Sequence, residues 1–589
     1  MNAKYRCNVK ERYFCTTDGT AIYREALQNA NAIRDDPFMN FWPELVELKQ
    51  VDDGFTVRDR VIFRAYRGGV YEPPVELEKK DMIGNLPHAK FSPACRIFRG
   101  RGNIPRCGEL MEMQCEEANT RRVYAHTGWK MIDGKRVFLN GGYSVTADGL
   151  TDQYTVELDP DLARCYRFVP YSGGNACGVT MSMYQLIPDF LAVPSLAYVF
   201  LSPLNEMLRT SGGEPCFSLY FIGKTGSYKS SWSKVLLGFF GQLGYAETAP
   251  ITFLDTENAI GRKLGLGADI PLLLDDRRPT SNARDKLIYE SKEKFVSSAI
   301  GDRAARGRLN ADSTAKVSYI ARCNLIVTAE EAFQNIGSSA IARSVSVELE
   351  PTTIQHDKLQ VLQENTAALN KTMQLYLQWV IQNYDEIKHR SGEILRQYRD
   401  YFSNAGHARL ATAFSQLMFG YTQFLRFMTD QGQLDGERAE QMAKRALEIF
   451  RDMCEQQSRK VEREKPTLLF VELLKEMLET KQCFIADIGD NPSQVVRHNT
   501  IGYKDKDYLY LIGNTAYSAV RQFYAQQGNE FPSSMVNLWK MFRDEGKLIP
   551  DVTGNRVDKR KRINGKSGRY IWLRADLLDE KESEGNTDE

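Results

Sequence analysis

An α/β fold with a parallel sheet covered on both faces is the class that residues 210–356 predict. Apolar runs of strand length, Phe217–Ile222, Ile270–Leu274 and Asn324–Thr328, alternate there with segments of helix length, which is typical of such a sheet. A glycine-bearing loop follows the first run, and polar residues end the other two. The polar residues are therefore expected at the carboxyl ends of strands, where α/β sheets bind ligands.

The size and charge of the chain exclude several other classes. The 589 residues suggest about three or four domains. With 42% apolar and 26% charged residues, the composition excludes collagen-like, coiled-coil and wholly disordered proteins. The net charge of +1 provides no global attraction to nucleic acid or membrane, so any such attraction must be local.

The compartment is predicted from the N-terminus, the cysteines and the longest apolar region. Charged residues stand where a signal peptide needs an apolar core, and the eleven cysteines include no CxxC pair. The apolar region 183–208 contains three prolines and two acidic residues, so we expect buried helices or loops there and no membrane span. A cytoplasmic protein with reduced thiols is the expectation.

The part before the α/β segment is expected to be β-rich. Short alternating runs such as Val61–Arg67 are broken by Gly and Pro. The clearest hairpin has strands Trp129–Ile132 and Lys135–Leu139 around Asp133-Gly134, a pair that tolerates the positive φ angles of a type I′ turn. We assign residues 1–114 to an N-terminal region of unknown role and 115–209 to a β-rich domain.

The loop after Phe217–Ile222 has the residue types that bind a triphosphate. Backbone N–H groups and a helix N-terminus can hold phosphates, a lysine can contact the terminal ones, and a serine hydroxyl can ligate Mg²⁺. The expected ATP-binding residues are Gly223, Gly226, Ser227, Lys229 and Ser230. The usual pattern GxxxxGK[ST] has glycine where this chain has Tyr228, and the alternative is an ordinary glycine-rich turn.

Two carboxylates follow the second apolar run. We assign Asp275, with Ser230, to the metal ion and Asp276 to polarising the attacking water. The alternative is a solvated acidic pair neutralised by Arg277 and Arg278.

A polar residue and an arginine complete the predicted catalytic set. Thr328 ends the third run, where it can sense the γ-phosphate or hold the water. Arg343 is a candidate arginine finger, because a planar guanidinium can neutralise transition-state charge; a surface arginine is the alternative. The order of loop, acidic strand, polar-ended strand and arginine is that of an AAA+ type P-loop ATPase.

The remainder of the chain is predicted to be helical and then winged-helix-like. Apolar residues recur at helical spacing through 357–464, as in Met442, Ala446, Ile449 and Met453. Within 465–575, helices near 515–526 and 533–545 precede a hairpin over 548–573, the element order of a winged helix. Residues 576–589 form an acidic tail that is expected to be disordered.

Local charge identifies the expected DNA contacts. Residues 547–574 contain nine Lys or Arg and two Asp, so the predicted wing can neutralise phosphates. A second basic segment lies between the acidic and polar-ended strands, where ring ATPases project a loop into the channel. The candidate DNA-binding residues are Arg556, Lys559, Arg560, Lys561, Arg562, Lys566 and Arg569 on the wing, and Arg303, Arg306 and Arg308 in the second segment. The alternative for the wing is a solvated hairpin neutralised by the acidic tail.

The stretch from His126 to Gly142, HTGWKMIDGKRVFLNGG, resembles the signature of the Cch-like helicases carried by staphylococcal cassette chromosomes, pathogenicity islands and related mobile elements. Further similar segments are Phe253–Asn258, the strand ending in Asp275-Asp276, Gly301–Asn310 and Leu325–Glu330. The resemblance covers roughly 115–575. It implies a ring-forming, ATP-driven DNA helicase related to AAA+ and superfamily 3 proteins. Its matching segments include Lys229, Ser230, Asp275, Asp276, Thr328 and Arg343, whereas Tyr228 and Asp276 replace the Gly and Glu of many relatives.

The leading hypothesis is therefore a hexameric, ATP- and Mg²⁺-dependent helicase that translocates on single-stranded DNA during replication of a mobile element or phage. Single-stranded and forked DNA are the expected partners, with a primase or single-strand-binding protein as a further possibility. One alternative is an ATP-switched replication initiator or regulator that binds duplex DNA without unwinding it. A protein-remodelling ATPase is another.

Overall fold

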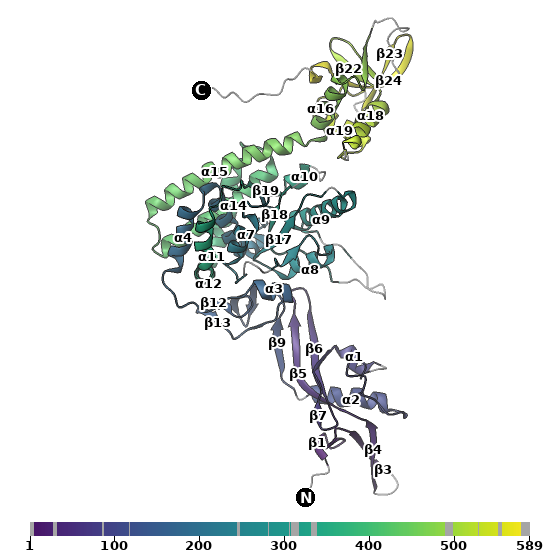
Figure 1. Ribbon diagram of the computed structural model, residues 1–589, viewed down its shortest axis with the longest axis vertical. Coiled ribbons are helices and arrows are strands. Elements are labelled where there is room, and N and C mark those ends of the chain that lie inside the picture. Colours follow the sequence, from purple (N-terminus) through teal and green to yellow (C-terminus); the bar gives the residue numbers. More distant parts are fainter. Residues whose placement is uncertain are drawn as a thin grey trace.

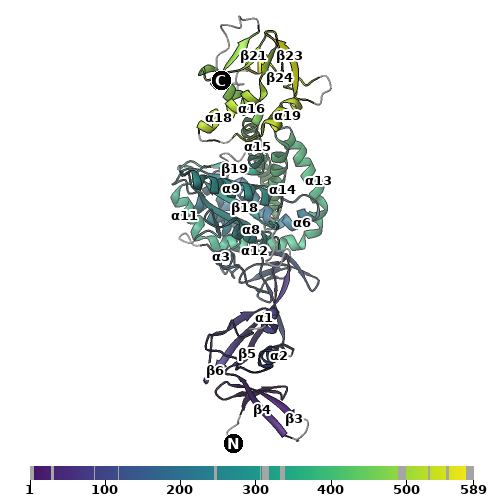
Figure 2. The same cartoon turned by 90° about the vertical axis from the view of Figure 1, so that its right-hand side faces the viewer.

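The computed structural model describes residues 5–27, 32–84, 87–116, 118–243, 248–280, 282–304, 307, 317–331, 338–488, 499–527, 529, 531–551 and 556–578. The molecule is elongated, with the N-terminal region at one end and the C-terminal domain at the other (Figure 1). The largest hydrophobic core runs through the middle, from Trp129 to Val461. A view from the side shows the same order along the long axis (Figure 2).

Two sheets form the N-terminal region. The first is antiparallel, in the order β1 (Tyr5–Val9), β2 (Tyr13–Thr16), β3 (Ala21–Leu27) and β4 (Ala32–Met39). The second sheet contains β5 (Trp42–Asp52), β6 (Val57–Arg67), β7 (Val70–Tyr71) and β8 (Val75–Leu77). Helices α1 (Lys79–Ile83) and α2 (Asn103–Glu116) contact β6 and β5 of this sheet, respectively. Alternation along β6 places Val61, Phe63 and Ala65 in the core, as its sequence pattern predicts.

The second sheet crosses the domain boundary that we predicted between residues 114 and 115. Strand β9 (Thr120–Tyr124) pairs in parallel with β5, and β14 (Thr155–Val156) pairs with β9. Parallel pairing needs a long connection, and here α1 and α2 lie between β5 and β9 in the chain. The strands from β5 to β9 therefore belong to one sheet that crosses this boundary, which the local sequence pattern does not reveal.

The predicted hairpin around Asp133-Gly134 is confirmed. Strands β10 (Gly128–Ile132) and β11 (Lys135–Leu139) pair in the expected register, with Ile132 opposite Lys135. Both turn residues have positive φ, 49° and 76°, as a type I′ turn requires. Strands β12 (Ser144–Thr146) and β13 (Gly149–Thr151) complete this sheet.

The apolar region before the parallel sheet is buried, as predicted. After α3 (Pro160–Cys165) and α4 (Ala176–Leu186), helix α5 (Asp189–Leu201) leads through a short 3-10 turn into α6 (Asn205–Thr210). The stretch Asp189–Thr210 is long and apolar enough to cross a bilayer, but 94% of its most apolar window is inside the protein. It therefore has the character of a core helix.

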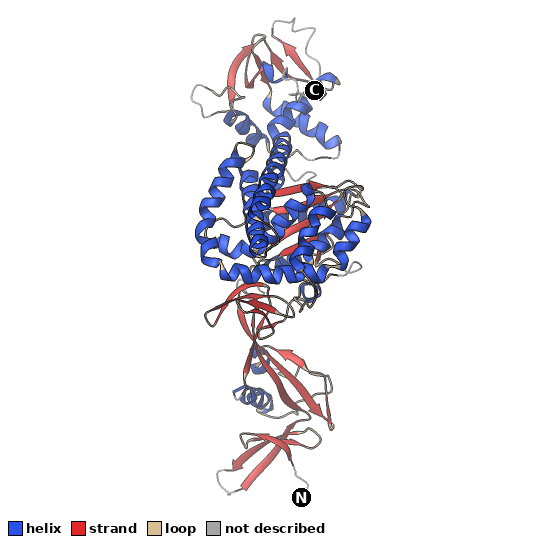
Figure 3. Cartoon of the chain, turned by 90° about the vertical axis from the view of Figure 1, so that its left-hand side faces the viewer, coloured by secondary structure: helices blue, strands red, loops and turns tan. Residues whose placement is uncertain are grey.

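A five-stranded parallel sheet confirms the predicted α/β class. Its strands are β15 (Ser218–Ile222), β16 (Ile251–Thr252), β17 (Pro271–Arg277), β18 (Asn324–Ala329) and β19 (Ser344–Glu348), in the spatial order β16-β17-β18-β15-β19. Helices α7 (Lys229–Leu237), α8 (Glu257–Leu266), α9 (Ala283–Gly301) and α10 (Ser338–Ile341) connect them. Figure 3 shows these strands enclosed by helices. Because β18 lies between β15 and β17, the residues that follow these three strands meet at one edge.

The helices after the sheet belong to the same core. They are α11 (His356–Glu364), α12 (Thr366–Gln382), α13 (Tyr384–Ser403), α14 (Ala408–Asp430) and α15 (Gly436–Arg463). The predicted stripe on α15 packs inward: Ala446 and Ile449 are buried, and Met442 and Met453 pack against the core. Residues 357–464 are helical as predicted, and they cover the sheet instead of forming a core of their own.

The C-terminal domain has a separate core beneath a five-stranded sheet. Its order is β20 (Phe484–Asp487), β21 (Thr500–Lys504), β22 (Tyr508–Leu511), β24 (Lys566–Arg574) and β23 (Asp558–Ile563). Helices α16 (Pro466–Glu479), α18 (Gly513–Gln526) and α19 (Met535–Asp544) pack together beside it. The regular hairpin starts later than predicted, at Asp558. Leu548 forms only an isolated bridge to Leu573.

His126, in the signature stretch, is a buried histidine with an unusual pKa. Its Nδ1 donates to the carbonyl oxygen of Thr127 at 2.7 Å, and Nε2 has no hydrogen-bond partner among the described residues. Burial and the nearby positive charge of Arg322 lower the pKa of His126 to about 4. The folded protein therefore binds this proton more weakly than the unfolded chain does.

This difference predicts a loss of stability in mild acid. The pKa is lowered on folding, so the stabilisation is complete above about pH 6.5 and decreases as the pH falls towards 4. Between pH 7 and pH 5, the free energy of unfolding should fall by about 2 kcal/mol more in the wild type than in His126→Gln. Urea unfolding at both pH values measures this. Equal pH dependences of the two proteins would contradict the prediction.

Candidate functional site

The loop between β15 and α7 has the backbone conformation of a tight turn. Gly226 has φ +90°, and Tyr228, which directly precedes the helix, has φ +58°. A left-handed tyrosine is uncommon, because its Cβ crowds the backbone. Tyr228 thus adopts the conformation that a glycine at this point would favour.

Two polar side chains of this loop are buried with few or no protein partners among the described residues. The Ser227 hydroxyl is fully buried and has no hydrogen-bond partner among the described residues. The Lys229 side chain is also buried. Its Nζ lies 3.4 Å from the carbonyl oxygen of Lys224, and no described carboxylate lies within 4.0 Å of it. Buried polar groups are normally satisfied, so this loop has the unmet donors that an anion would occupy.

The Ser230 hydroxyl meets the acidic strand directly. Ser230 Oγ donates to Asp275 Oδ1 at 2.7 Å, and Thr328 Oγ1 donates to the same oxygen. Side chains that are 45 and 53 positions apart in sequence thus converge on one carboxylate at the carboxyl edge of the sheet. Oxygen ligands of these types are the ones that Mg²⁺ prefers.

Asp276 is placed differently from its neighbour. Its backbone has φ +73°, and its side chain is 42% exposed and pairs with Arg278 at 2.5 Å. Its backbone N–H donates to Thr328 Oγ1 at 2.9 Å. The Thr328 hydroxyl therefore contacts both acidic residues, which favours a positioning role for it. The pairing expected in the alternative interpretation is present for Asp276 and Arg278, whereas Arg277 points inward to Glu293.

Arg343 lies at the opposite edge of the sheet from this cluster. It directly precedes β19, and its carbonyl oxygen accepts from the N–H of Ser218, the first residue of β15. Its guanidinium pairs with Asp302. The structure therefore does not bring Arg343 to the predicted ATP-binding loop of its own chain, and its role as an arginine finger stays a prediction that needs a neighbouring subunit.

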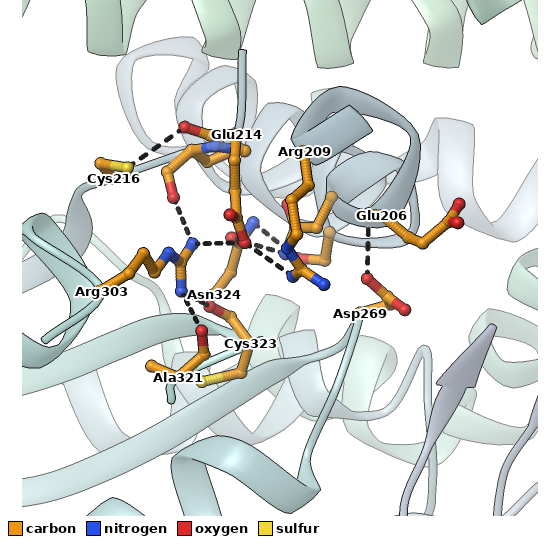
Figure 4. A network of polar contacts seen from close by, with 12 residues as sticks. Glu206, Arg209, Glu214, Cys216, Asp269, Arg303, Ala321, Cys323 and Asn324 are labelled. Carbon is orange, nitrogen blue, oxygen red and sulfur yellow. Dashed lines mark hydrogen bonds and ion pairs between the residues drawn. The ribbon is translucent and has the colours of Figure 1, made fainter. Parts of the chain in front are cut away.

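Arg303 forms a buried network at the same edge (Figure 4). Its guanidinium donates to the carbonyl oxygens of Ala321 and Cys323 at 3.0 and 3.2 Å, and it pairs with Glu214 at 3.3 Å. The side chain is only 13% exposed. Such an arginine holds the protein together, so the DNA contact that we predicted for it has no support here. Arg306 and Arg308 lie outside the described residues.

The basic hairpin of the C-terminal domain divides into paired and unpaired cations. Arg569 pairs with Asp558 at 2.8 Å, Lys561 pairs with Asp505 at 3.2 Å, and Lys559 lies over the Trp572 ring. The others are exposed, and among the described residues no carboxylate lies within 4.0 Å of them. These four free cations are Arg556, Arg560, Arg562 and Lys566.

Two features near the loop were not found from the sequence. The Tyr228 ring lies 5.9 Å from that of His356, the first residue of α11, and Thr225 Oγ1 donates to Glu330, which follows β18. The position of Glu330 two residues beyond Thr328 was a usable signal, because it also follows the end of a strand. Nothing local in the sequence connects His356 with the loop.

Comparison with solved structures shows a shared fold. The chain superposes on a protein described as "SCCmec type IV Cch - active helicase" with a TM-score of 0.59 and 13% sequence identity, covering 96% of this chain and 99% of that one. No family model matches the sequence, and no curated protein matches it. The resemblance to Cch-like helicases is thus supported at the level of the fold, along nearly the whole length of both chains.

Proposed function

We propose that this protein is an ATP-driven DNA helicase. The observation that supports it most is the convergence of Ser230, Asp275 and Thr328 at the carboxyl edge of the parallel sheet, beside a buried lysine. That arrangement is what a P-loop ATPase needs, and it occurs in a chain that has the fold of a helicase.

The loop residues fit a nucleotide and a magnesium ion. Ser227, Lys229 and the N-terminus of α7 would hold the triphosphate, and Ser230 with Asp275 would hold Mg²⁺. When bound, the ion would neutralise charge on the phosphates. Asp276 is the proposed residue for orienting water, and Thr328 fixes the two acidic residues relative to each other.

The DNA contacts are proposed for the hairpin β23–β24, which serves as the wing of a winged-helix-like domain. The four exposed, unpaired cations can each approach a phosphate without first breaking an ion pair. We also propose an AAA+ type ring of six subunits. The position of Arg343 supports this assembly, because its guanidinium lies too far from its own loop to act there. Replication of a mobile element or phage, a cytoplasmic location, and a primase or single-strand-binding partner are also part of the proposal.

One assay set tests the function. ATP hydrolysis is measured with and without single-stranded DNA, and strand displacement is measured on a forked duplex. We expect hydrolysis to be stimulated by single-stranded DNA and the fork to be unwound only with ATP and Mg²⁺. Hydrolysis that is indifferent to DNA would instead support a protein-remodelling ATPase.

A duplex-binding initiator is the second candidate, and the exposed face of α19 favours it. Leu538, Trp539 and Phe542 are buried, but Val536, Asn537 and Lys540 are exposed along the opposite face. Polar and apolar side chains at this spacing suit base edges in a major groove. Tight duplex binding without strand displacement in the same assays would support this function.

A further inference from the structure

Arg343 does not reach the proposed nucleotide loop of its own chain. Strand β15 begins at Ser218, beside Arg343, and ends at Ile222, just before the nucleotide loop. Five residues of strand span about 17 Å, which is more than twice the reach of an arginine side chain. If the proposed function is correct, this guanidinium therefore serves a neighbouring nucleotide site, and something must fix its direction.

Asp302, directly after the last residue of α9, fixes the direction of the Arg343 guanidinium. Arg343 Nη2 donates to both carboxylate oxygens of Asp302, at 2.7 and 2.9 Å, and Nη1 donates to Ser339 Oγ. The Arg343 side chain is 16% exposed. A guanidinium whose two terminal nitrogens are held in this way has a fixed plane, so less entropy is lost when its remaining N–H groups meet a phosphate.

Gly301 leaves the space in which the Arg343 side chain lies. A Cβ built on Gly301 would lie 2.2 Å from Cδ of Arg343, well inside contact distance. The arginine stem therefore lies directly against the backbone of the last residue of α9, and only glycine leaves that space. This explains why a glycine stands next to Asp302, inside a segment that the sequence singled out for a different reason.

Arg303, the residue after Asp302, connects this end of α9 to the sheet. Arg303 has φ +50° and bonds the carbonyl oxygens that precede β18, as Figure 4 shows. It also donates to the carbonyl oxygen of Pro215, in the segment that leads into β15. Arg303 thus links Asp302, its neighbour in the chain, to the segments that lead into β18 and β15 at the amino edge of the sheet.

The middle of α9 is attached to the acidic strand. The helix follows β17 in the chain, and Arg277 pairs with Glu293 on α9 at 3.5 Å, with both side chains almost fully buried. A helix of 19 residues is about 28 Å long. The C-terminal half of α9 thus connects Arg277, next to Asp276, with the residues that hold Arg343.

We propose that Gly301 and Asp302 form a seat that positions Arg343 for the nucleotide site of a neighbouring subunit, with α9 connecting the seat to the acidic strand of its own chain. Asp302 is a positioning residue, because it acts through Arg343. The proposal rests on the proposed function and adds a requirement to it: the acceptor site and the seat belong to different chains.

Mixed-subunit ATPase assays test the seat. Asp302→Asn should lower kcat for ATP at least tenfold while KM changes less than threefold, and Asp400→Asn, an exposed aspartate on α13, should leave both unchanged. Mixing Asp302→Asn with Lys229→Ala subunits should restore hydrolysis, because the second subunit supplies a seated Arg343 to the intact loop of the first. Mixing Asp302→Asn with Arg343→Ala should restore nothing.

Gly301→Ala, which keeps every charge, should behave as Asp302→Asn does. Restored hydrolysis in a mixture with Lys229→Ala also shows that a variant is folded. Wild-type kcat in Asp302→Asn, or rescue of it by Arg343→Ala, would overturn the seat. If Arg343→Ala and Lys229→Ala subunits fail to rescue each other, then Arg343 does not act between subunits. That result would contradict the ring assembly of the proposed function.

Discussion

Replacing Lys229 by alanine should reduce ATP hydrolysis by about 10²- to 10³-fold or more, the cost of removing one charged group that stabilises a developing charge. The ammonium is buried, has no described carboxylate partner and lies inside the loop. A methyl group cannot replace its interaction with the terminal phosphates.

The measurement is steady-state hydrolysis with saturating DNA, together with nucleotide binding by a fluorescent ATP analogue. Lys444→Ala is a suitable control, because Lys444 is 69% exposed on α15 and its ion-pair partner among the described residues is Glu440, one turn away. Undiminished hydrolysis in Lys229→Ala would remove the basis of the assigned nucleotide site.

The second large effect concerns DNA. Changing Arg560, Arg562 and Lys566 to glutamine should weaken binding of single-stranded DNA by about 10- to 100-fold near 0.15 M salt. Each lost phosphate contact should also reduce the salt dependence of log affinity by about 0.7 to 0.9. The slope should therefore fall by about 2 to 3 in the triple variant. The physical reason is that fewer counterions are released from the DNA.

Titrations at several salt concentrations give both quantities. A matched variant removes three exposed cations from α15, Arg451, Arg459 and Arg463, and should keep the wild-type slope. A slope that falls equally in both variants would indicate a general charge effect. An unchanged slope in the hairpin variant would place the DNA on another surface.

The sequence predicted the features that depend on local pattern. The parallel sheet follows from apolar runs, and the meeting of Ser230 with Asp275 follows from the rule that carboxyl ends of parallel strands share an edge. The Asp133-Gly134 hairpin follows from turn chemistry. Each of these was available within about ten residues of chain or from the order of elements.

Features that depend on distant parts of the chain could not be predicted in this way. The β5–β9 pairing joins segments separated by α1 and α2. The sheet therefore crosses the domain boundary that the local sequence pattern predicted between residues 114 and 115. The carboxylate that holds Arg343 is 41 positions earlier in the chain. Arg303 has the sequence character of an exposed DNA contact, yet its guanidinium satisfies buried carbonyl groups.

The joint between the N-terminal region and the central body has a mechanical consequence. Asp52, at the end of β5, pairs with Lys130 at 2.7 Å, and Tyr319 donates to Asp53 at 3.0 Å. Arg322 reaches the carbonyl oxygen of Gly54. A hinge would need a flexible linker, whereas these bonds and the pairing of β5 with β9 connect the two parts firmly. Any rotation of the central body would therefore carry the far end of the N-terminal region through a much larger arc.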